Sequence, residues 1–184
     1  VTALVPEEGK HTLRATLRIP NVERWWPHTH GKPARYRVAA VLRGAGDDLT
    51  VDLGTIAFRT VELDSTDGAF TIRVNGQELF CRGACWSPID VVTLAGDDAA
   101  YRDALTLARD AGMNMLRAGG TMTYETDTFY DLCDELGILV WQEFMFANMD
   151  YPEEDTFLGS VREEAGQLLR RLHGSSQHVG EAHQ

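Results

Sequence analysis

Residues 129–141, FYDLCDELGILVW, contain the pattern that decides the fold class. The apolar residues of its first eight positions recur at helical spacing, and Gly137 stands where such a helix would end. Residues 138–141 are continuously apolar, which is typical of a parallel strand covered on both faces. The stretch therefore predicts a helix that leads directly into a buried parallel strand.

The segments on both sides repeat this succession. Apolar residues recur at helical spacing over residues 101–111, between the candidate N-cap Asp97 and Gly112. Residues 113–117 form a short predicted strand, and an apolar stripe over residues 157–172 predicts a third helix. Strands that alternate with helices in this way favour a parallel α/β fold, either a (β/α)8 TIM barrel or a doubly wound sheet.

Phosphate-binding glycine motifs are missing from the sequence. Neither G-x-G-x-x-G nor G-x-x-x-x-G-K-[ST] occurs, which counts against nucleotide binding. The barrel is therefore the better prediction, with its first strand expected near residues 79–81. Only three βα units fit into residues 64–174, whereas a complete barrel takes about 250 residues, so this domain is expected to be the opening part of a barrel.

The amino-terminal third has a period of two residues. Alternating apolar residues fill short runs within residues 12–63, and Asn, Gly, Pro and Asp separate the runs. This pattern favours an immunoglobulin-like β-sandwich, which has about seven strands in about 100 residues. We expect residues 1–63 to form a partial sandwich. Asn75-Gly76 predicts a two-residue hairpin turn, and residues 175–184 are set apart as an atypical tail.

The composition excludes two classes of partner. The 28 acidic and 17 basic residues give a formal net charge of −11, so nucleic-acid phosphates would be repelled. No stretch reaches the roughly 20 consecutive apolar residues of a transmembrane helix, so no membrane partner is expected. The sequence shows no signal-type segment either, and we therefore expect a cytoplasmic protein.

The cysteines and histidines do not predict a metal site. Cys81, Cys85 and Cys133 are odd in number, and the first two lie four positions apart rather than the three of most zinc knuckles. We expect buried or partly buried free thiols. His28 and His30 lie in a loop without a third ligand group, so a structural role is expected for them.

Candidate functional residues stand at the ends of the predicted parallel strands, where a barrel carries its chemistry. They combine aromatic rings with charged groups, the mixture that binds the C–H faces and hydroxyls of a sugar. The set is Trp86, Asp90, Arg117, Glu125, Trp141 and Glu143. Parallel strands present their carboxyl ends to one side of a barrel. We therefore predict that five of these residues lie close together there: Trp86, Asp90, Arg117, Trp141 and Glu143.

Structural roles remain open for several of these residues. Trp86 and Trp141 could be core aromatics, and Arg117 could simply pair with a neighbouring carboxylate. Glu143 directly follows a buried strand, where an unpaired carboxylate is costly. Its position therefore favours a role at or beside the site.

A series of short motifs occurs in a characteristic order. They are Trp25-Trp26-Pro27-His28, Phe58-Arg59-Thr60, Val74-Asn75-Gly76, Arg82-Gly83-Ala84-x-Trp86-x-Pro88-x-Asp90, Gly112-Met113-Asn114-Met115-Leu116-Arg117, Phe129-Tyr130-Asp131-Leu132-Cys133-Asp134-Glu135-Leu136-Gly137 and Trp141-Gln142-Glu143-Phe144-Met145-Phe146-Ala147. Together they resemble the β-mannosidase branch of glycoside hydrolase family 2 over residues 12–172.

The resemblance implies an immunoglobulin-like domain followed by the opening of a (β/α)8 barrel. It also implies removal of terminal β-mannosyl residues from oligosaccharides and glycosides with retention, which uses two carboxyl groups about 5–5.5 Å apart. A β-mannoside would be the substrate, and no metal or organic cofactor is implied. The missing parts of the parent chain would be the other partner.

The sequence departs from the family in ways that affect catalysis. Relatives have an acid/base Glu in an Asn-Glu pair after the third barrel helix and a nucleophile on a later strand, but Asn-Glu does not occur here. We assign no catalytic residue, not even Glu181, and expect a fragment that is inactive alone. The resemblance also implies an amino-terminal jelly-roll domain, which we expect to be one of the parts missing from this fragment. Ala118 stands where many relatives have Trp, and Glu143 where Asp is commoner.

Two alternatives remain, of which the first differs in class from this interpretation. Trp25-Trp26 could form the platform of a non-catalytic module that binds carbohydrate or a partner through the β-rich half. The chain could also have another family 2 specificity, that of a β-galactosidase or a β-glucuronidase. Residues 83–86 speak against the latter, because those relatives tend to have polar residues such as Asn-Arg-His there.

Overall fold

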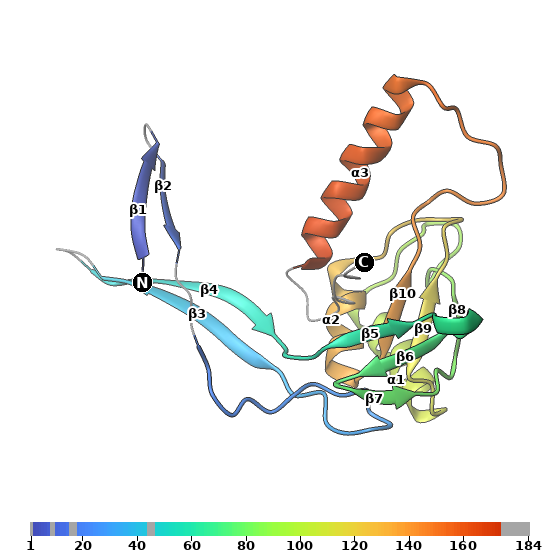
Figure 1. Ribbon diagram of the computed structural model, residues 1–184, viewed down its shortest axis with the longest axis horizontal. Helices are drawn as coiled ribbons and strands as arrows, with labels where there is room; N and C mark the ends of the chain where they lie inside the picture. The colour runs from blue at the N-terminus through green and yellow to red at the C-terminus, as the bar shows by residue number, and fades with distance from the viewer. Residues whose placement is uncertain (1, 8–9, 15–17, 44–46, 174–184) are drawn as a thin grey trace.

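Three parallel strands form the sheet that the central stretch predicts. They are β8 (Gly83–Trp86), β9 (Met115–Ala118) and β10 (Leu139–Gln142), adjacent in that order. Helices α1 (Asp98–Asp110), α2 (Asp127–Leu136) and α3 (Asp155–His173) follow them in turn (Figure 1). The computed structural model describes residues 2–7, 10–14, 18–43 and 47–173, so the predicted tail over residues 175–184 lies outside the described residues.

Local signals in the sequence set the ends of the helices. The Asp97 side chain accepts a hydrogen bond from the backbone N–H of Ala100 at 2.8 Å, which caps α1 as predicted. Gly137 has a left-handed φ of 73° and ends α2. Among the residues described, no helix is long and apolar enough to span a membrane.

Each face of the parallel sheet packs against a different partner. Leu116 and Val140 lie in one hydrophobic cluster with residues of α1 and α2, including Leu105 and Phe129. On the other face, Leu139 lies in a second cluster with residues from the amino-terminal segment and the preceding hairpin. Residues 138–140 are buried as predicted, but the strand itself begins at Leu139, and Trp141 is 40% exposed.

An antiparallel sheet precedes the parallel one. It contains β5 (Val61–Asp64), β6 (Thr71–Val74) and β7 (Gln77–Leu79) in that order. Asn75 and Gly76 both have positive φ, 52° and 82°, so the predicted hairpin turn is confirmed. The boundary predicted between residues 63 and 64 lies within β5.

The prediction for the first parallel strand is wrong. The segment near residues 79–81 belongs to the end of the antiparallel hairpin, and the first parallel strand is β8. A Cβ at Gly83 would lie 1.8 Å from the carbonyl oxygen of Met115. Only glycine therefore allows β8 to lie this close to β9 at that point.

The amino-terminal strands form two separate antiparallel pairs. One contains β1 (Thr2–Glu7) and β2 (Lys10–Arg14), and the other contains β3 (Tyr36–Leu42) and β4 (Leu49–Ile56). The β3–β4 ribbon extends away from the parallel sheet (Figure 1). Leu49 and Leu53 are each 58% exposed, so within the described residues the ribbon has no second sheet packed over these side chains.

The segment around Trp25 connects the β-rich part to the α/β part. The Trp25 indole N–H donates to the carbonyl oxygen of Asp134 at 2.8 Å, and the backbone N–H of His28 donates to that of Gly137 at 3.0 Å. The Arg59 guanidinium is buried. It lies 4.4 Å from the centroid of the Trp25 ring and 3.7 Å from the Asp134 carboxylate. Since Trp25 is fully buried, it cannot form half of an exposed sugar platform.

Candidate functional site

Three side chains form a row across the face of the parallel sheet opposite α1 and α2. Arg117 of β9 is in register with Cys85 of β8 and with Trp141 of β10. Successive residues of a strand face opposite sides, so the neighbours Leu116 and Val140 pack toward the helices while this row faces away from them. The sequence prediction included Arg117 and Trp141 but missed Cys85.

Arg117, at the centre of this row, forms an ion pair with Glu143, which directly follows β10. The Nε and Nη2 atoms of Arg117 each lie 2.7 Å from Oε1 of Glu143. The other carboxylate oxygen accepts a hydrogen bond from the backbone N–H of Gly120 at 3.2 Å. The Arg117 contact first, and the Gly120 N–H second, lower the pKa of Glu143. Glu143 is therefore a paired carboxylate, as its position in the sequence indicates.

Cys85 adds a third contact to Arg117. Its Sγ atom accepts a hydrogen bond from Nη1 of Arg117 at 3.4 Å, and its side chain is exposed. All three cysteines are free thiols as expected, with Cys133 buried and Cys81 partly buried. The exposure of Cys85 contradicts the expectation that every thiol would be at least partly buried. Side chains alternate along a strand, so a sequence prediction with the correct pairing of β8 and β9 would have placed Cys85 beside Arg117.

Trp141 lies over an apolar cavity beside this row. Its ring stacks on Phe70 at a centroid distance of 5.4 Å and an interplanar angle of 25°. The cavity has a volume of about 320 Å³, and its lining includes Leu63, Ile72 and Leu139 as well as these two rings. Phe70 was not predicted as a site residue, because its contact with Trp141 joins segments 71 positions apart in the sequence.

Trp86 and Glu125 lie on the helix side of the sheet and not in the row. The Trp86 ring packs 4.9 Å from the Phe129 ring, and its N–H donates to Glu125 Oε1 at 2.8 Å. The Tyr101 hydroxyl donates to Oε2 at 2.6 Å, and Glu125 is 2% exposed. Because Cys85 faces Arg117, its neighbour Trp86 must face the helices. Trp86 therefore ends β8 at the same carboxyl edge as Arg117 and Glu143, but it lies on the helix side of the sheet.

Asp90 does not join the row either. Its carboxylate accepts hydrogen bonds from the backbone N–H groups of Val92 and Thr93, at 2.7 and 2.9 Å. These contacts lower the pKa of Asp90 and hold the turn that follows β8. Of the five residues predicted to lie together, Arg117, Trp141 and Glu143 do so.

The structure shows that a Trp side chain beside Glu143 could be carried by residue 119 but not by residue 118. Ala118 is 4% exposed and packs toward the helices, so a Trp at this position would enter the core. A Cβ at Gly119 would have Oε2 of Glu143 as its nearest neighbour, at 3.9 Å. The Trp side chain that many relatives have at the position of Ala118 would therefore fit at residue 119 of this chain and not at residue 118.

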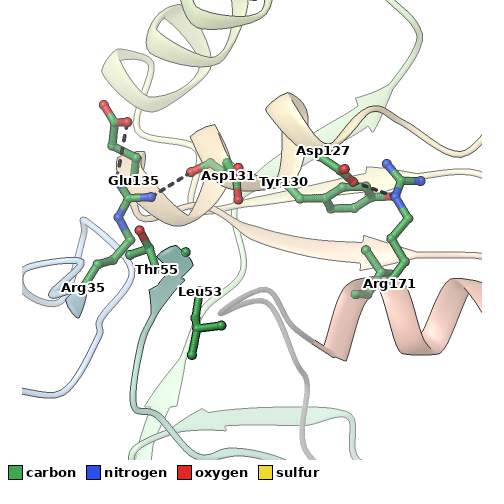
Figure 2. A pocket seen from close by; sticks show the side chains of 10 residues that line it. Arg35, Leu53, Thr55, Asp127, Tyr130, Asp131, Glu135 and Arg171 are labelled. Atoms are coloured by element: carbon green, nitrogen blue, oxygen red, sulfur yellow. Dashed lines mark hydrogen bonds and ion pairs between the residues drawn. The ribbon is translucent and has the colours of Figure 1, made fainter. Parts of the chain in front are cut away.

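A second cavity of about 480 Å³ is lined by residues of α2, the end of α3 and the end of β4, together with Arg35. Figure 2 shows Arg35 beside Glu135 and the backbone of Asp131, while Arg171 lies against Asp127 at 2.6 Å. Most of the charged side chains that line this second cavity form these contacts. None of the lining residues belongs to the row of Cys85, Arg117 and Trp141. Among the described residues, no group of three or more His, Cys, Asp or Glu side chains could hold a metal ion.

Comparison with known proteins identifies what this arrangement resembles. No protein-family model matches the sequence. The β-mannosidase of Bos taurus is 38% identical over 175 residues, which cover 90% of this chain and 20% of that protein. The chain resembles one segment of a β-mannosidase. It spans about 20% of the length of the curated relatives it matches, so this β-mannosidase-like chain corresponds to a fragment of them.

Solved structures agree with this result. The β-D-mannosidase from Dictyoglomus thermophilum matches with a TM-score of 0.78 and 38% identity, over 88% of this chain and 20% of that one. A β-glucuronidase from Parabacteroides merdae matches with a TM-score of 0.75 but 23% identity, over 91% of this chain and 20% of that one. The second likeness shows the fold alone. The resemblance to the β-mannosidase branch of glycoside hydrolase family 2 is confirmed and favoured over the alternatives.

Proposed function

We propose that this β-mannosidase-like chain supplies part of the glycone site of a retaining glycoside hydrolase that removes terminal β-mannosyl residues. The observation that carries the proposal is the Arg117–Glu143 pair. It lies in register with Trp141 beside the carboxyl ends of parallel strands, in a chain 38% identical to a β-mannosidase. In a barrel these strand ends surround the substrate.

The proposed roles follow from the contacts of each side chain. Arg117 keeps N–H groups for sugar hydroxyls because Glu143 neutralises its charge and fixes one edge of the guanidinium. The half-exposed ring of Trp141 offers an apolar face to a sugar C–H surface. Asp90 holds the turn after β8, and Trp86 with Glu125 holds the loop at residues 119–125, so these three residues support the site indirectly.

This proposal includes an assignment of domains. Residues 1–63 belong to a partial immunoglobulin-like sandwich, residues 64–174 to the first three βα units of a TIM barrel, and residues 175–184 to a tail. The parallel order β8-β9-β10 with a helix after each strand supports the barrel. The exposed apolar side chains of β4 support a sandwich whose other strands come from elsewhere in a parent chain.

The chemistry of retention requires two carboxyl groups that flank the glycosidic bond, a nucleophile and an acid/base. Glu143 is held by Arg117 and Gly120, and Glu125 is buried between Trp86 and Tyr101. Neither carboxylate has the free approach to a sugar that a nucleophile needs. The two catalytic carboxylates of the proposed enzyme therefore come from outside this segment.

A pair of activity measurements tests this function. The 184-residue chain, purified to homogeneity, should not detectably hydrolyse an aryl β-mannoside, whereas the full-length protein should. The full-length protein should prefer aryl β-mannoside to aryl β-glucuronide and β-galactoside. A reversed preference would reject the substrate, and turnover by the isolated chain would reject the view that it lacks the catalytic carboxylates.

A further inference from the structure

Cys85 is the member of the row that the proposed function leaves without a role. Its exposed Sγ atom lies 3.4 Å from Nη1 of Arg117, the end of the guanidinium that Glu143 does not contact. The two residues are register partners on adjacent strands. The thiol therefore meets Arg117 through the pairing of β8 with β9 and not through a flexible loop.

The guanidinium of Arg117 is consequently held at both ends. Nε and Nη2 contact Oε1 of Glu143, and the other oxygen of Glu143 is fixed by the backbone N–H of Gly120. Nη1 contacts Cys85. A guanidinium carries five N–H donors in a plane, and these contacts leave one donor on each terminal nitrogen. Two anchors at opposite ends determine where those remaining donors lie.

We propose that Cys85 is a positioning residue for the substrate-binding arginine of this glycosidase, since it fixes the Arg117 guanidinium so that its two remaining N–H groups meet sugar hydroxyls. The inference rests on the proposed function for the role of Arg117. It goes further by assigning a function to an exposed thiol that does not pack in the core.

Sulfur suits this position because of its reach. A hydrogen bond to sulfur is longer than the roughly 2.9 Å typical of N–H···O bonds, and neighbouring strands lie about 4.8 Å apart. Serine keeps an acceptor but has a shorter bond to it, and alanine keeps none. The hydrogen bond with Cys85 makes the largest contribution to raising the pKa of Arg117, and the hydrogen bond with Glu143 makes the next largest. The charged guanidinium is thus the form that the two anchors stabilise.

Steady-state kinetics of the full-length protein test this role, with whichever aryl glycoside it hydrolyses best. Cys85→Ala should raise KM about fivefold or more and change kcat less than about twofold, because a displaced binding group is lost to ground state and transition state alike. The KM of Cys85→Ser should lie between that of the wild type and that of Cys85→Ala. Cys81→Ala is the matched control, since Cys81 is a partly buried thiol packed in the cluster around Trp25. It should lower Tm without changing KM.

Alkylation of the wild-type protein gives a second measurement that needs no variant. Iodoacetamide should label Cys85 and leave the buried Cys133 unlabelled, as followed by mass spectrometry of peptides. The monosaccharide product of the same reaction should slow labelling of Cys85 about fivefold or more, because a sugar held by Arg117 covers its anchor, and should leave Cys81 unaffected.

The outcomes separate the two proposals. An unchanged KM in Cys85→Ala, or equal labelling of Cys85 with and without the sugar, overturns the positioning role even when the enzyme cleaves β-mannosides. Cleavage of a different glycoside with the expected Cys85 effects rejects only the β-mannoside assignment. A full-length protein that cleaves no glycoside overturns both.

Discussion

Ala118 and Gly119 are neighbours that face opposite sides of the parallel sheet, so they should tolerate a large side chain very differently. An indole at residue 118 must enter the cluster between β9 and the helices. Ala118→Trp should therefore destabilise the full-length protein by about 2 kcal/mol or more, the cost of an overpacked core. Gly119→Trp should cost less than about 1 kcal/mol, because only Glu143 lies within 4 Å of its Cβ. Denaturant unfolding of both variants measures the two losses of stability. A larger loss in Gly119→Trp than in Ala118→Trp would mean that residue 118 does not face the helices.

Glu143 should make a contribution to stability that depends on pH. Its pKa is lowered in the folded protein by Arg117 and the Gly120 N–H. A carboxyl group whose folded pKa lies below its unfolded value stabilises the fold above the unfolded pKa of about 4.3, and the contribution fades as pH falls through the folded pKa. The difference in unfolding free energy between wild type and Glu143→Gln should thus be present at neutral pH and disappear in acid. A difference that persists or grows toward acid would contradict the charge-assisted pair.

At the scale of elements, the buried carboxylate of Glu125 joins the end of β8 to α1. It accepts hydrogen bonds from Trp86 and Tyr101, while its backbone oxygen accepts one from Arg171 of α3. Glu125→Ala should cost about 3 kcal/mol, because two donors in the core lose their acceptor, and Tyr101→Phe about 1 kcal/mol. The double variant should cost less than the sum, since the two share one contact. Strict additivity in equilibrium unfolding would show that Tyr101 and Glu125 do not act together.

The elements that the sequence predicts well are those with local signals. Asp97 caps α1, Gly137 ends α2, and Asn75-Gly76 forms the hairpin turn, each through contacts within a few residues. The first parallel strand was misplaced because its position depends on a distant contact. β8 is identified by the approach of Gly83 to the backbone of Met115, 32 positions away, and no local pattern reports that approach.

The candidate site shows the same division between local and distant information. Residue type and position after a strand predict Arg117, Trp141 and Glu143, which the structure brings together. The side of the sheet that each residue faces depends on where its strand begins, so the sequence alone does not show that Trp86 faces the helices, and Cys85 was missed. The stacking of Phe70 on Trp141 depends on the packing of one sheet against another.

At the scale of the whole molecule, apolar surface remains uncovered on both parts of the chain. In the part that the structure describes, β10 pairs with β9 alone, which leaves the backbone groups of its outer edge without a strand partner. Leu63 and Phe70 beside this edge are more than half exposed, as are Leu49 and Leu53 of the ribbon. Such surfaces are typical of a segment whose neighbours in space belong to a longer chain.

The isolated chain should therefore associate or aggregate, or remain loosely packed, despite its net charge of −11. Leaving about 400 Å² of apolar surface exposed forgoes roughly 10 kcal/mol at about 25 cal/mol per Å², comparable to the whole stability of a typical domain. Sedimentation should show species larger than a monomer, and thermal unfolding should be broad. Trp141→Lys, which places a charge at the open edge, should reduce association. Phe80→Lys is the matched control, because Phe80 is 80% exposed but follows β7 and does not lie in β10. A monomer with one sharp transition would show that the described strands already complete their own core.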